Sequence, residues 1–193
     1  YGNATGITVG GTYLCEVGFN GANQYVQYTN GKSQAVTAYT NAAFNSSKFS
    51  VGCRMSASGG AVQEYIGANV AEIVLYDAAN TSGNAKQRIR SYLAAKYGFT
   101  LDQTTPYDYL TSDGTTKMWD ATANSTYKNN ITIIGRDDAS ALNQKQSKSR
   151  DNTVTTTQTI GMVTIGLGTI EATNAQNAAT FGADRSFEAI GDN

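Results

Sequence analysis

Hydrophobic and polar residues alternate along most of the chain, and their period becomes that of a helix in only one segment. That segment covers residues 84–97, where four apolar residues recur at the spacing of one helix face: Ala85, Ile89, Tyr92 and Leu93. Gly98 follows where a left-handed glycine ends a helix, and Lys96 suits the negative end of the helix dipole. The pattern predicts a short amphipathic helix that serves as scaffold, with its basic residues, Arg88 and Arg90 among them, mostly on other faces.

The remaining periodic segments are short, rich in β-branched and aromatic residues, and separated by turn residues, which predicts strands. The expected strands are residues 11–19, 24–29, 33–37, 49–55, 71–76, 107–110, 116–119, 131–136, 158–167 and 186–190. Asn30-Gly31 predicts a tight hairpin because both residues tolerate positive φ, and residues 112–114 predict a second hairpin. Residues 174–183 indicate a loop or a short helical turn. The class is therefore mainly β with one helix.

Composition excludes some classes of function. The chain has 193 residues, which suits one domain or one domain with an appended module. A net charge of −1 argues against a nucleic-acid binder, which needs a basic surface to neutralise phosphates. No apolar run approaches the length of a membrane span. Histidine is absent and the glutamates are scattered singly, so we expect no enzymatic activity.

Polar clusters after residue 118 leave a binding function as the alternative. Trp119 and the adjacent Asp120 are candidate ligand-binding residues, because an indole can stack on a sugar ring, although a strand Trp is more often core. Arg136 and Asn143 are further candidates. The neighbouring carboxylates of residues 137 and 138 would supply the oxygen ligands that Ca²⁺ prefers, and the candidate calcium ligands are Asp137 and Asp138. The competing interpretation is a turn with Arg136 paired to a carboxylate. We expect no other cofactor.

The two cysteines, Cys15 and Cys53, each lie in a strand-like run. A disulfide between neighbouring strands would close a long loop. Two buried thiols explain the same pattern, and the sequence leaves both interpretations open.

The chain also resembles a known family. The resemblance is strongest over residues 71–149, in AEIVLYD and QRIRSYLAAKYGFTL and then in SDGT, WD and IIGRDDASALNQKQSKS; before them, Tyr28-Thr29-Asn30-Gly31-Lys32 is similar to a laminin-G-like hairpin. The segment up to residue 101 resembles the end of a laminin-G-like, concanavalin A-like domain of large secreted Bacteroidota cell-surface proteins and adhesins, and the rest resembles the module appended to it. The ending, residues 187–191, lacks the Trp-containing strand of that family.

The resemblance implies a concanavalin A-like or jelly-roll antiparallel sandwich in residues 1–101 and an appended β-rich module in residues 102–193. Such a sandwich needs more strands than residues 1–70 supply, so we expect the others from sequence outside this chain or from a neighbouring subunit. The implied function is a non-enzymatic structural or adhesive module, secreted by the type IX route to the cell surface. Its partners would be neighbouring domains or other copies of the chain. The alternative is a lectin-like module that binds surface glycans, with or without calcium.

Overall fold

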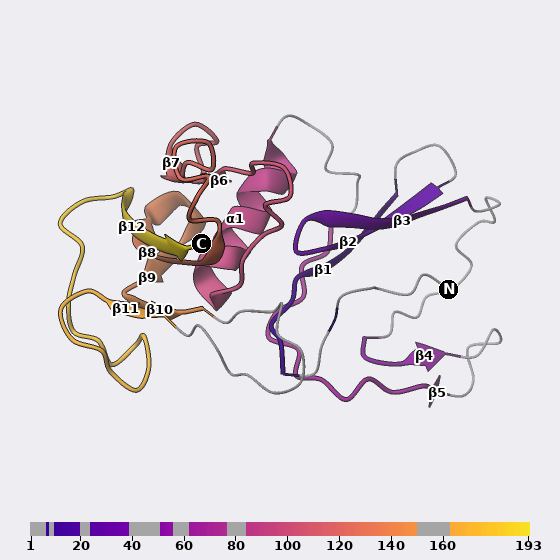
Figure 1. Cartoon of the computed structure of the whole chain (residues 1–193). Coiled ribbons are helices and arrows are strands. Elements are labelled where there is room, and N and C mark those ends of the chain that lie inside the picture. The colour runs from indigo at the N-terminus through magenta and orange to yellow at the C-terminus, as the bar shows by residue number, and fades with distance from the viewer. Residues whose placement is uncertain are drawn as a thin grey trace.

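The computed structural model describes residues 7, 10–19, 24–38, 51–55, 62–76, 84–149 and 163–193. It is mainly β with one α-helix, and its strands form small antiparallel sheets (Figure 1). The elements are β1 (Cys15–Phe19), β2 (Gln24–Thr29), β3 (Lys32–Ala38), β4 (Arg54–Met55), β5 (Val62–Gln63), α1 (Ala85–Tyr97), β6 (Tyr109–Leu110), β7 (Lys117–Trp119), β8 (Asn129–Asp137), the 3₁₀ turn η1 (Asp138–Ser140), β9 (Leu142–Gln144), β10 (Gln146–Lys148), β11 (Thr164–Gly166) and β12 (Ser186–Asp192). Within the described ranges, no helix combines the length and apolar character that crossing a membrane requires.

The N-terminal sheet has the order β1-β2-β3 and contains the first predicted hairpin. Asn30 and Gly31 connect β2 to β3 with φ values of 48° and 83°, the left-handed conformation that a two-residue hairpin turn requires. The Asn30 side chain accepts a hydrogen bond from the Leu14 N–H at 2.8 Å, and the Asn30 carbonyl accepts one from Asp102 N–H. The hairpin turn therefore also attaches this sheet to the chain that follows α1.

The predicted helix is confirmed within one residue, since α1 begins at Ala85 and ends at Tyr97. Gly98 caps it in the left-handed conformation at φ 67°, and its N–H bonds to the Ala94 carbonyl. A Cβ at this position would overlap the backbone carbonyl of Lys148, so strand β10 and the helix end can approach closely only at a glycine.

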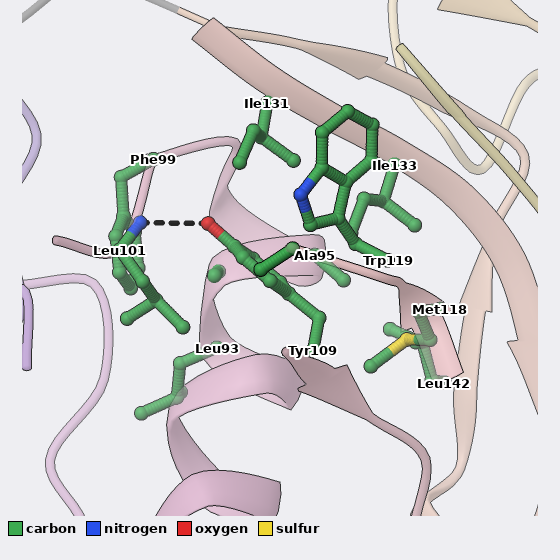
Figure 2. Packing of buried hydrophobic residues seen from close by; sticks show 12 residues of the cluster. Leu93, Ala95, Phe99, Leu101, Tyr109, Met118, Trp119, Ile131, Ile133 and Leu142 are labelled. Atoms are coloured by element: carbon green, nitrogen blue, oxygen red, sulfur yellow. Dashed lines mark hydrogen bonds between the residues drawn. The ribbon is translucent and has the colours of Figure 1, made fainter. Parts of the chain in front are cut away.

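The core lies between α1 and the strands that follow it. Its buried apolar cluster is Leu93, Ala94, Ala95, Phe99, Leu101, Tyr109, Met118, Trp119, Ala121, Ile131, Ile133 and Leu142 (Figure 2). Strand β8 is central, because β12 pairs with one edge and β9 with the other. Tyr109 is fully buried, and its hydroxyl accepts the Leu101 N–H at 2.7 Å. The buried cluster contains residues from both sides of position 101, such as Phe99 and Tyr109. The domain boundary that the sequence predicts between residues 101 and 102 remains a prediction.

Polar contacts join the N-terminal sheet to α1. The Arg90 guanidinium forms a bidentate ion pair with Glu16 of β1, with N–O distances of 2.8 and 2.9 Å, and stacks 4.7 Å from the ring centre of Tyr28. Burial acts to lower the pKa of Arg90, but the hydrogen bonds to Glu16 and the Glu16 charge outweigh it and raise that pKa. Arg90 is buried in this contact, and Glu16 compensates its charge there.

Residues 71–76 are extended, but they are not a strand in the structure, which contradicts the sequence prediction. A strand exists only where a neighbour accepts its backbone hydrogen bonds, and none of the described elements does so here. Their side chains are exposed, with Leu75 at 68%. The predicted strand at 49–55 is also reduced to β4, with its first two residues outside the described ranges.

We predict that Tyr109→Phe lowers the free energy of unfolding by about 1–3 kcal/mol, because it leaves the buried Leu101 N–H without its acceptor. Urea unfolding followed by circular dichroism measures the change. Tyr127→Phe removes the same hydroxyl from a side chain that is 53% exposed, and it should leave the unfolding midpoint unchanged. Equal midpoints for the two variants would contradict the structural role of Tyr109.

Candidate functional site

A groove of about 480 Å³ lies beside α1. Alternate residues of the extended segment, Glu72, Val74 and Tyr76, line one side of it. The helix contributes its predicted apolar face, Ala85, Ile89, Tyr92 and Leu93, together with Arg88. Ile89 and Tyr92 are half-buried, since they pack against the core cluster and also line the groove. The apolar face predicted from the sequence therefore contributes Leu93 to the buried core, whereas Ile89 and Tyr92 lie between the core and the groove.

The segment of residues 67–76, here called the open strand, borders the groove. No backbone hydrogen bond to it is present among the described residues. Five of its apolar side chains are exposed: Val70, Ile73, Val74, Leu75 and Tyr76. Its attachment to the helix is the Glu72 carboxylate, which accepts hydrogen bonds from Lys96 at 2.9 Å and Tyr97 at 2.7 Å. The hydrogen bond from Lys96, followed by that from Tyr97, lowers the pKa of Glu72, so this carboxylate is ionised at neutral pH.

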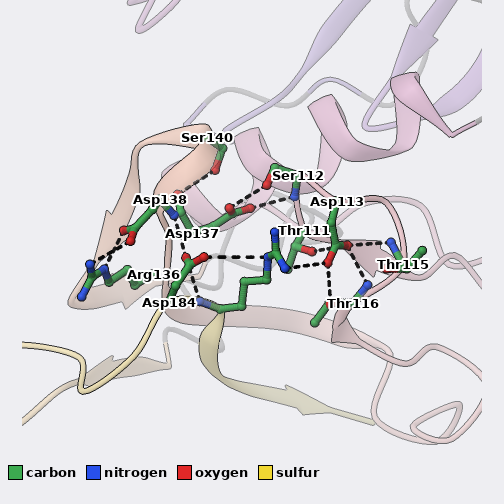
Figure 3. Close-up of polar contacts among 11 residues, drawn as sticks. Thr111, Ser112, Asp113, Thr115, Thr116, Arg136, Asp137, Asp138, Ser140 and Asp184 are labelled. Atoms are coloured by element: carbon green, nitrogen blue, oxygen red, sulfur yellow. Dashed lines mark hydrogen bonds and ion pairs between the residues drawn. The ribbon is translucent and has the colours of Figure 1, made fainter.

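The far wall of the groove has a polar end near Asp137 at the end of β8. Asp137 is 1% exposed, and its carboxylate accepts hydrogen bonds from both the N–H and the hydroxyl of Ser112 at 2.7 Å (Figure 3). Arg88 donates to the Ser112 carbonyl at 2.7 Å. Its Nε is buried and has no acceptor, and no carboxylate of the described chain lies within ion-pair distance of its guanidinium.

Ionic contacts extend from this end across the loops. The Arg136 guanidinium donates two hydrogen bonds to the Asp138 carboxylate, and the Asp138 N–H donates to the Asp184 carboxylate at 2.8 Å. Arg185 then lies 3.3 Å from Asp113. Figure 3 shows these side chains paired in succession along the loops, so each carboxylate has its own donors.

Asp113 organises the predicted second hairpin. Its carboxylate accepts hydrogen bonds from the N–H groups of Thr115 and Thr116 and from the hydroxyls of Thr111 and Thr116. The Thr115 N–H, then the other three donors, hold the pKa of Asp113 far below its usual range. This is the chemistry of an Asx turn, which the Ser-Asp-Gly sequence indicates.

The structure does not support the predicted calcium site. Asp137 faces Ser112, whereas Asp138 faces Arg136, so the two carboxylates do not converge on one point. In the part of the chain that the structure describes, no three acidic or cysteine side chains gather as metal ligands. The competing interpretation, a turn with Arg136 paired to a carboxylate, describes the observed contacts.

The predicted sugar-binding residues are not brought together as one surface. Trp119 is only 6% exposed and packs in the core, so it cannot offer a stacking face, and that prediction is wrong. Asp120 accepts hydrogen bonds from the N–H groups of Thr122 and Ala123, with Lys117 at 2.8 Å. Asn143 is exposed and lies opposite Arg136 across β8 and β9.

Cys15 and Cys53 are not joined by a disulfide in the structure. Cys15 is exposed and Cys53 is half-buried, so the alternative of two buried thiols does not describe them either.

Sequence reasoning missed Arg88 and the groove itself. The signal that was available was the apolar character of residues 70–76, which is present on both alternating faces. Such a segment is typical of a strand buried on both sides. This apolar segment and the apolar helix face are both signals of surfaces that pack against another element.

Comparison with known proteins identifies one family. The family model described as Domain of unknown function (DUF8202) matches residues 85–193, from the first residue of α1 to the end of the chain. No curated protein and no solved structure matches the chain. The matched residues include the whole buried cluster and the network around Asp113 and Asp137, whereas the open strand precedes them.

We predict that Asp113→Asn destabilises the chain at neutral pH and that the difference from wild type shrinks as the pH falls below about 4, the ordinary carboxyl value. The folded pKa is depressed, so the unfolded chain takes up the proton first and the stabilisation disappears in acid. Urea unfolding at a series of pH values measures the difference.

Asp102→Asn is the control for loss of one negative charge, since Asp102 accepts only a single hydrogen bond from a side chain, that of Thr104. A difference between wild type and Asp113→Asn that stays constant from neutral pH to acid would contradict the role of the Asp113 carboxylate.

Proposed function

We propose that this chain, which belongs to the DUF8202 family, is a non-enzymatic structural or adhesive module of a large secreted bacterial cell-surface or extracellular-filament protein. The observation that carries the proposal is the open strand, an apolar segment that no described residue pairs with through its backbone and whose large apolar side chains are exposed. Such an edge pairs readily with a strand from elsewhere, which is how strand addition joins modules.

The groove supports this function because it leaves room for a further strand beside α1. Glu72, Val74 and Tyr76 point to the same side as alternate residues of a strand do, and they face the half-buried Ile89 and Tyr92 of α1. A strand placed beside the open strand would set its own alternate side chains over the same helix face. We propose that strands from a neighbouring domain or another copy complete here a concanavalin A-like sandwich, to which residues 102–193 are appended.

The polar contacts of the matched region also support a structural role. Asp113, Asp137 and Asp138 each bind backbone N–H groups or arginine, and these contacts hold turns and strand ends in place. Carboxylates that are bound to such partners do not resemble an acid and base facing each other across a cleft. Secretion by the type IX route belongs to the same proposal, because it follows from the resemblance of residues 71–149 to adhesin modules.

We predict that hydrogen–deuterium exchange followed by mass spectrometry will show fast exchange at residues 67–76 in the isolated chain and slow exchange in protein extracted from the cell surface. In the assembled protein a donor strand would protect these amides. The β8 amides are the internal control, because both edges of β8 are paired in the chain alone. Fast exchange at residues 67–76 in the extracted protein, or absence of the chain from the cell surface, would contradict the proposal.

A glycan array probed with and without a chelator of Ca²⁺ distinguishes the lectin-like alternative from the structural module. A structural module leaves the array blank in both conditions. Binding that disappears with the chelator would replace the structural proposal with a calcium-assisted lectin, and binding that persists would indicate a lectin without calcium.

A further inference from the structure

The groove contains a positive charge that the described chain does not neutralise. Two other basic residues of α1 have carboxylate partners, since Arg90 pairs with Glu16 and Lys96 with Glu72. Arg88 lines the groove, and among the described residues its guanidinium donates to the Ser112 carbonyl alone. A guanidinium offers five N–H donors, and in an apolar surrounding its charge is far better stabilised by a carboxylate than by one carbonyl.

The neighbouring acidic groups do not fill this role. Asp137 also lines the groove, but its two oxygens accept hydrogen bonds from Ser112. Glu72, on the opposite side, is held by Lys96 and Tyr97 at the other end of the helix. None of the described residues therefore supplies a carboxylate to Arg88, and an acidic side chain of a ligand in the groove would provide one.

The shape of the site defines the rest of the ligand. Three alternate residues of the open strand line the groove, and no described residue pairs with its backbone, which suits an extended peptide. The groove wall is apolar at Val74, Ile89 and Tyr92. A strand paired beside it would place every second side chain in the groove. Such a strand would bury apolar residues along most of its length and meet Arg88 at the polar end.

We infer that the groove binds a donor strand from another polypeptide or domain, apolar at alternate positions and with one Glu or Asp side chain that pairs with Arg88. This inference rests on the proposed function and adds the chemistry of the partner. The carboxylate would fix the register of the donor strand, because a shift by one residue would turn it away from Arg88.

The test uses a fluorescent peptide of alternating Ser and Val in which one central Val is replaced by Glu, and the same peptide with Gln in place of Glu. Anisotropy titration of the chain should give about tenfold tighter binding of the Glu peptide, as expected for one charge-assisted hydrogen-bonded pair. Arg88→Gln should abolish the preference, whereas Arg88→Lys should retain part of it. Arg136→Gln, which removes an arginine outside the groove lining, should leave the preference intact.

Equal affinity of the wild-type chain for the Glu and Gln peptides, or binding of neither, would overturn the inference. The proposed function is tested independently by the hydrogen–deuterium exchange of residues 67–76 in protein extracted from the cell surface. Circular dichroism of each variant confirms that the fold is retained before affinities are compared.

Discussion

The packing of α1 against β6 and β8 is the contact on which the described structure depends. The whole buried cluster lies between Leu93 and Leu142, and the Tyr109 hydroxyl ties the chain after the helix into it. Burial of apolar surface is the main favourable contribution to folding, and it is concentrated here. The family match begins at the first residue of the same helix, in agreement with a unit that includes α1.

The N-terminal sheet depends on α1 in a different way. Its contacts with the helix include the Arg90–Glu16 ion pair and the packing of Arg90 and Lys86 over the Tyr28 ring, and no residue of β1, β2 or β3 belongs to the buried apolar cluster. These contacts cover one side of the helix and leave Ile89 and Tyr92 beside the groove. The open strand is attached mainly through Glu72. The described structure therefore has one well-packed part, around α1, and one segment, residues 67–76, with which no described strand pairs.

Local sequence signals were accurate where local chemistry decides the conformation. Asn30-Gly31 forms the hairpin turn, Asp113 forms the second turn, and Gly98 ends the helix. The same reasoning failed at residues 71–76, because the β-propensity of a segment does not supply the neighbour that it must pair with. It also missed β9 and β10, which have polar sequences. These segments form strands because β9 pairs with β8 and β10 pairs with β11.

Site residues were harder to predict than elements, because a side chain's role depends on what faces it. The sequence around Trp119 is compatible with a sugar platform, but the side chain is buried in the core. The position of Asp137 is compatible with a calcium ligand, but Ser112 donates hydrogen bonds to both of its oxygens. By itself, the sequence determined the helix, its apolar face, the turns and the mainly β class, since these follow from residue spacing and turn chemistry. Only the tertiary structure decided that this helix face borders a groove, that Glu16 neutralises Arg90 and that no described carboxylate pairs with Arg88, because charge compensation is set by residues far apart in the chain.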